Sequence, residues 1–271
     1  MGKLLRADLF RAFRYKIFYL LPAVNAVVGV FSVINQLAWR GYADVSAFDV
    51  LAGGFGGGIG FIGILNAVLV AVFIGHEYAC GAMRNKVMTG GGRSKIYLSK
   101  LAVSSAMCAA VYLAYHVVNF VLGSALLGWG AHSSSEIVLA FFAGLFMSLA
   151  YCAIFTGVSM LSKNTVVSLL SGVLGTLCIL LLVIWVQGEL EGTYFFPEGS
   201  EEGVWLPCQW PAFWQGLARF AIRLVPTGQS VLLSMGSLSM SDMGTLIGLS
   251  CVWIVLSAAG GSLVFRKIDM K

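Results

Sequence analysis

Long, uninterrupted runs of apolar residues dominate the chain, and short polar segments separate them. The runs do not alternate between apolar and polar positions, so they predict helices rather than strands. About 20 helical residues cross a hydrocarbon core of roughly 30 Å, and a lipid-exposed helix satisfies its own backbone hydrogen bonds. We therefore predict six transmembrane helices, at residues 17–38, 58–76, 98–127, 137–160, 165–187 and 244–264.

Residues 2–15, ahead of the first apolar run, have a different pattern. Leu5, Leu9, Ala12 and Phe13 recur at helical spacing, and arginines occupy other positions around the helix. This pattern predicts an amphipathic interfacial helix that lies on the membrane surface. The alternative is a frayed, basic N-terminus.

The longest link between apolar runs spans residues 188–243. Its first part is acidic, and Trp205, Trp210 and Trp214 then indicate an aromatic belt at a membrane interface. Residues 212–224 have helical periodicity, which a break at Pro226 and Gly228 interrupts before it resumes. We predict a helical hairpin that enters the outer leaflet, with a surface loop as the alternative.

Composition and charge place the chain among membrane proteins. Hydrophobic residues make up 59% of it and charged residues 11%, whereas soluble domains carry about 25% charged residues. If the six spans cross the membrane in turn, all but three of the 17 lysines and arginines lie on the same side of it. The excess of basic residues predicts that this face, with both termini, is cytoplasmic. The fold expected is an all-α polytopic protein of the cell membrane, and its positive charge reflects topology rather than nucleic-acid binding.

Sequence patterns for catalysis or cofactor binding are absent. No Gly-x-x-x-x-Gly-Lys-Ser/Thr loop occurs, so the chain is not expected to bind ATP itself. His76, Glu77 and Cys80 are similar to a zinc signature, but His116 and His132 are expected too far away to complete a metal site. We therefore predict no catalytic, metal or cofactor residues and no enzyme activity.

Two polar residues lie within the third predicted span. His116 and Asn119 are one helical turn apart, where polar groups are costly unless they find a partner or line a path. They are candidates for a substrate or gating contact. The alternative is a hydrogen bond between helices.

The segment 77–97, between the second and third spans, carries the most specific pattern. Its cationic residues are Arg84, Lys86, Arg93 and Lys95, and a further lysine, Lys100, follows just beyond it. It resembles the loop of type-2 ABC exporter permeases. In that family the second span ends in Gly-x-Glu-Tyr, a turn containing Arg-Asn follows, and the third span begins with Arg-x-x-Ile-Tyr-x-Ser-Lys. The matching residues are Gly75, Glu77, Tyr78, Gly81, Arg84, Asn85, Arg93, Ile96, Tyr97, Ser99 and Lys100.

The resemblance implies a role for this loop and partners for the chain. In that family the loop is a cytoplasmic coupling helix that docks on a separate ABC ATPase subunit, which binds the ATP. Glu77, Tyr78, Gly81, Arg84, Asn85 and Arg93 would form the docking loop. The chain would be one permease domain, dimeric with a second copy or a paralogue. Its cargo would be an antimicrobial peptide, an antibiotic or another amphipathic compound, and export would confer antibiotic resistance. The alternatives are an ion-coupled secondary transporter and a membrane anchor or sensor that recruits a soluble partner.

Overall fold

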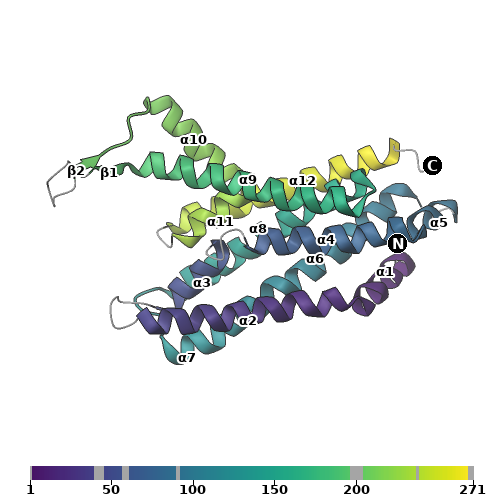
Figure 1. The fold of residues 1–271 in the computed structure, drawn as a ribbon, viewed down its shortest axis with the longest axis horizontal. Coiled ribbons are helices and arrows are strands. Elements are labelled where there is room, and N and C mark those ends of the chain that lie inside the picture. Colours follow the sequence, from purple (N-terminus) through teal and green to yellow (C-terminus); the bar gives the residue numbers. More distant parts are fainter. Residues whose placement is uncertain are drawn as a thin grey trace.

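A computed structural model describes residues 2–39, 46–56, 61–89, 92–195, 204–235 and 238–267. Helices account for most of these residues, and many run side by side along the long axis of the molecule (Figure 1). The one sheet among the described residues is a hairpin of β1 (Thr193–Phe195) and β2 (Val204–Leu206), which pair antiparallel.

Six helices in the described part of the chain are long and apolar enough to cross a membrane, as predicted. They are α2 (Lys16–Trp39), α4 (Phe61–Ala79), α6 (Arg93–Val118) with its continuation, α8 (Ser134–Ser162), α9 (Thr165–Glu191) and α12 (Met240–Lys267). The third span continues beyond α6 through a π-helical turn, η1 (Asn119–Gly123), and α7 (Ser124–Leu126). The chain is thus an all-α polytopic membrane protein.

Several helix ends differ from the predicted bounds. The third span begins at Arg93 rather than residue 98, because Ile96 and Tyr97 are buried against the bundle and hold the first turns in place. The fifth ends at Glu191 rather than residue 187, because Leu190 is buried in a hydrophobic cluster with Val183 and Ile222. Residues 58–60, where the second span was predicted to start, lie outside the described residues.

The sequence pattern missed α3 (Ala47–Gly56), which lies in a predicted external loop. Its start is capped by reciprocal contacts: the Ser46 amide and hydroxyl both donate to Asp49 Oδ2 at 2.8 Å, and the Asp49 amide donates to the Ser46 hydroxyl at 3.4 Å. Phe48 and Leu51 are buried, and α3 packs against α11. The helix therefore forms because its apolar side chains find a partner far away in the sequence.

The predicted hairpin in residues 188–243 contains two helices, α10 (Ala212–Leu224) and α11 (Pro226–Ser234). The helix does break here, but only Val225 separates the two helices, so Pro226 and Gly228 belong to the second helix rather than to the break. Pro226 is the first residue of α11, where its missing N–H costs nothing. Gly228 allows close contact, since a Cβ there would overlap the Ile222 carbonyl.

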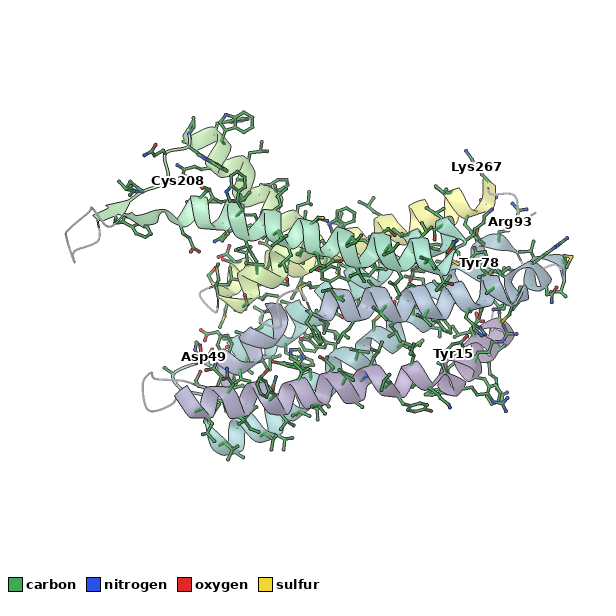
Figure 2. All side chains as sticks on the ribbon, viewed as in Figure 1. Tyr15, Asp49, Tyr78, Arg93, Cys208 and Lys267 are labelled. Carbon is green, nitrogen blue, oxygen red and sulfur yellow. The ribbon has the colours of Figure 1, made fainter. Side chains whose placement is uncertain are left out.

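One end of the bundle brings together segments from both ends of the chain. The N-terminal helix α1 (Gly2–Arg14), the short helix α5 (Ala82–Met88) and the end of α12 lie at this end (Figure 1). Tyr15, Tyr78, Arg93 and Lys267 mark it, whereas Asp49 and Cys208 mark the opposite end (Figure 2). The two described chain ends therefore share one side of the bundle, as an even number of spans requires.

Candidate functional site

The loop between α4 and α6 contains the short helix α5, and Gly81 sets its direction. Gly81 precedes α5 with φ 66°, a left-handed conformation that favours glycine. Its amide donates to the Tyr78 carbonyl, and its carbonyl accepts from the Asn85 amide, which begins the new helix. Met83 is then fully buried and fixes α5 against the bundle. The chain thus turns sharply at the end of α4 and immediately forms a second helix.

A buried ion-pair cluster of Asp8, Glu77, Lys86 and Lys100 lies beneath α5. Each residue comes from a different helix, α1, α4, α5 and α6 respectively. Asp8 and Lys100 have no exposed area, and Glu77 is 3% exposed. Two carboxylates and two ammonium groups make the cluster neutral, which is the condition for keeping charges out of water.

Every acid in the ion-pair cluster contacts both lysines. The Lys86 ammonium lies 2.5 Å from Asp8 Oδ1 and 2.8 Å from Glu77 Oε2. The Lys100 ammonium lies 2.9 Å from Asp8 Oδ1 and also binds Glu77 Oε1. The Ser99 hydroxyl donates to the second oxygen of Asp8 at 2.8 Å. Four helices are therefore joined through one set of charge-assisted hydrogen bonds.

These contacts keep Asp8 and Lys86 charged near neutral pH. Burial by itself raises the pKa of Asp8, but the charge of Lys100 and the hydrogen bonds from both lysines outweigh burial, so the pKa falls below 3.8. Burial lowers the pKa of Lys86, but Glu77 and Asp8 outweigh it and raise the pKa above 10.5. Both groups therefore stay ionised across the physiological range.

Helix α1 has two distinct faces. Asp8 and Ala12 are four residues apart and buried, so they form the face that contacts the bundle. Ala12 was predicted to belong to the exposed apolar stripe, and this part of the prediction is wrong. The rest of the predicted stripe lies elsewhere on the helix: Leu5 and Leu9 are 38% exposed and Phe13 is 49% exposed. An apolar stripe that the protein does not cover is the feature required of an interfacial helix.

The end of α4 is also fixed against α8 and α9. The Tyr78 hydroxyl donates to the Met160 carbonyl of α8 at 2.9 Å. Gly75 allows α9 to approach closely, since a Cβ at this position would overlap the Thr165 side chain. Glu77 and Tyr78, both predicted to dock a partner, thus contact the protein's own helices.

The first turns of α6 are held by the last turns of α12. Arg93 donates to the Arg266 carbonyl at 2.9 Å, and the Tyr97 hydroxyl donates to the Ser257 carbonyl at 2.9 Å. Gly261 leaves room for the Tyr97 ring, because a Cβ there would overlap the hydroxyl. Arg93 is therefore at least partly engaged within the chain.

The outward face of α5 consists of Arg84, Asn85 and Met88. Arg84 and Asn85 are exposed, and Met88 is 65% exposed. These side chains combine a cation, an amide and an apolar group on a helix whose opposite face is anchored by Met83 and Lys86. Of the six predicted docking residues, Arg84 and Asn85 have the side chains most available to a partner.

His116 and Asn119 are not brought to this site. Both are 1% exposed, and Asn119 begins the π-helical turn η1. His116 Nδ1 lies 2.9 Å from the Tyr112 carbonyl in its own helix, and the two rings stack with centroids 3.8 Å apart. His116 also lines an apolar cavity of about 300 Å³ with Phe120 and Phe141. A π-helical turn commonly marks a functional position, so the pair stays a candidate for an intramembrane contact.

Sequence reasoning missed the roles of Asp8, Lys86 and Lys100. Lys86 was counted only among the basic residues of the loop, and Lys100 only as one of these and as part of the family pattern, yet both bind carboxylates inside the protein. The available signal was Asp8 itself, the single acid in a basic segment and four residues from Ala12. No group of three or more histidine, cysteine or acidic residues that could hold a metal ion occurs in the part of the chain that the structure describes.

No protein-family model matches this chain, and no curated protein matches it.

Proposed function

We propose that this chain is the membrane-spanning permease subunit of an ATP-driven exporter and that α5 is the helix on which a separate ATPase subunit docks. The observation that carries the proposal is the attachment of α5. It presents Arg84, Asn85 and Met88 outward, while the ion-pair cluster beneath it joins four helices. A short helix held in this way transmits a push from a partner to several spans as a rigid-body movement.

The contacts indicate two different functions for the residues of the loop. Arg84 and Asn85 are the residues proposed to touch the ATPase, with Met88 as an apolar anchor. Glu77, Tyr78 and Arg93 are proposed as positioning residues, because their side chains bind other helices of this chain. Gly81 supplies the turn between Tyr78 and the outward-facing Arg84.

The same contacts disfavour ion-coupled transport through Glu77. A carboxylate that releases and rebinds a cation during transport needs access to that ion. Glu77 instead binds Lys86 and Lys100 and is 3% exposed, so its negative charge is already compensated. We propose that the cluster is structural and that energy comes from the partner's ATP hydrolysis.

Orientation, dimer formation and cargo complete the proposal. We place α1 and α5 on the cytoplasmic side, because that end carries most of the basic residues. The exposed stripe of α1 would then lie on the cytoplasmic leaflet. A second permease, identical or related, completes the transport path, and an amphipathic antimicrobial compound is the proposed class of cargo.

Affinity purification of the tagged chain from its native membranes, in a mild detergent, tests the proposal. Mass spectrometry should identify a stoichiometric partner that contains a Walker A loop. Purification without such a partner, while a control membrane complex stays intact, would contradict the exporter proposal and favour an anchor or a secondary transporter.

A further inference from the structure

A cavity of about 610 Å³ lies beside the ion-pair cluster, between the α1–α2 junction and the end of α4. Arg11, Arg14 and Lys16 line it from one side, and His76 and Glu77 line it from the other, with Tyr15 between them. Figure 2 shows Tyr15 at this end of the bundle. The cavity is large enough for a small headgroup or anion.

The lining of this cavity has a net positive charge. Arg11, Arg14 and Lys16 face a single acid, Glu77, whose carboxylate already binds Lys86 and Lys100. Arg11 lies 3.6 Å from Glu77, a long ion pair in which about half of the arginine side chain remains exposed. The cavity therefore has cationic hydrogen-bond donors for an added anion.

Tyr15 adds a hydrogen-bond donor that has no acceptor among the described residues. Its hydroxyl is buried and makes no hydrogen bond to them. Its ring is held edge-on to His76, with centroids 5.0 Å apart. Burial, with the nearby Cys80 and Glu77, raises the pKa of Tyr15 to about 12, so the hydroxyl keeps its proton at neutral pH. A buried donor without a partner costs free energy that a ligand oxygen would recover.

The position of the cavity favours a ligand at the membrane surface. Lys16 begins the first candidate span, so the cavity lies where α2 leaves the membrane. Tyr19 and Leu20 of α2 are exposed immediately beyond the cavity, where acyl chains would run.

We propose that this cavity binds one phosphate-bearing anion through Arg14, Lys16 and the Tyr15 hydroxyl. The phosphate is carried either by an anionic phospholipid or by a small soluble anion. This inference uses only the α1–α2–α4 geometry and does not depend on an ATPase partner, so it can fail or succeed independently of the proposed function.

Native mass spectrometry of the purified full-length chain tests the site. The chain is titrated with phosphatidylglycerol, with phosphatidylcholine of the same acyl chains, and with inorganic phosphate as a competitor. Preferential binding of phosphatidylglycerol that millimolar phosphate does not displace identifies the lipid as the source. Saturable binding of inorganic phosphate, without a preference between the lipids, identifies a soluble anion.

Variants connect binding to the cavity. The double variant Arg14→Gln with Lys16→Gln should weaken binding of the preferred ligand about 25-fold, because each lost charge weakens it about fivefold. Tyr15→Phe should weaken it about tenfold, because only the hydroxyl is lost. Lys95→Gln with Lys267→Gln removes the same charge at the same end of the bundle but outside the cavity, and should leave binding unchanged. Equal loss in this control, or wild-type binding in both cavity variants, would overturn the proposal.

Discussion

The Lys86 ammonium lies 2.5 Å from the Asp8 carboxylate, which connects α5 to the N-terminal helix across 78 positions of sequence. Lys100 binds the same carboxylate oxygen from α6 at 2.9 Å. The helix proposed to receive an ATPase is thus fixed to the helix proposed to lie on the membrane. Movement of α5 would have to move α1, α4 and α6 together or break charged hydrogen bonds.

Loss of Lys100 should destabilise the protein strongly. In Lys100→Met, Asp8 and Glu77 would share only Lys86 in a buried setting, and breaking such a pair costs about 3–5 kcal/mol. Lys95→Met, on the exposed side of the same helix, should change stability by less than about 0.5 kcal/mol. Unfolding free energies measured in mixed micelles compare the two. Similar values for both variants would contradict the structural role of the ion-pair cluster.

Neutralising Asp8 should release α1 from the bundle. Asp8→Asn weakens the contacts to both lysines, and a buried polar group that loses its partner costs roughly 1–3 kcal/mol. Hydrogen exchange of the α1 amides should therefore rise at least about fivefold. Arg6→Gln changes an exposed charge of the same helix and serves as the control. Unchanged exchange in Asp8→Asn would show that other contacts hold α1.

The acid dependence of stability should change with Asp8. The pKa of this carboxyl is lowered below 3.8 in the folded protein, so its contribution is complete above 3.8 and is lost as pH falls through the folded value. Lys86, whose pKa is raised above 10.5, contributes fully below 10.5 and loses its contribution only as pH rises through its folded value. Thermal unfolding measured from acid to neutral pH should show a smaller acid loss in Asp8→Asn than in wild type. An identical loss of stability at acid pH in wild type and Asp8→Asn would contradict the lowered pKa of Asp8.

The turn at Gly81 should tolerate side chains poorly. Gly81→Ala places a Cβ in the left-handed region, which costs about 1–2 kcal/mol, whereas Gly81→Asn should cost less. Gly92→Ala is the matched control, since Gly92 has φ −59° and an added Cβ would make only ordinary contacts with Lys95. Thermal unfolding of the three variants measures the difference. Equal stability of the Gly81 and Gly92 alanine variants would argue against a constrained turn.

The general architecture could be predicted from the sequence, because continuous apolar runs suffice to indicate membrane-spanning helices. The periodicity of residues 2–15 also predicted a helix, but it did not predict which side of that helix faces the bundle. Leu5, Leu9 and Phe13 of the predicted stripe are exposed, whereas its Ala12 is buried against the bundle together with Asp8. The partners of Asp8 are about 80 to 90 residues away, so local periodicity has no means of indicating them.

The candidate site was predicted only in outline. The loop was located from its Glu-Tyr and Arg-Asn pattern, but the pattern does not distinguish side chains that face a partner from those that face the bundle. Glu77 and Arg84 are seven residues apart, and after the sharp turn at Gly81 Glu77 is buried whereas Arg84 is exposed. Helix α3 was missed for a similar reason, since its stability depends on packing against α11.

The central claim is that the outward face of α5 docks an ATPase. The direct measurement is quantitative capture of the co-purifying ATPase by wild type, Arg84→Ala with Asn85→Ala, and Lys95→Ala with Lys267→Ala. We expect the α5 variant to lose at least about tenfold in ATPase capture while it inserts and unfolds like wild type, since interface anchors typically contribute more than 1 kcal/mol each. The control should capture as wild type does. Full capture by the α5 variant, or absence of any ATPase with the wild-type chain, would contradict the claim.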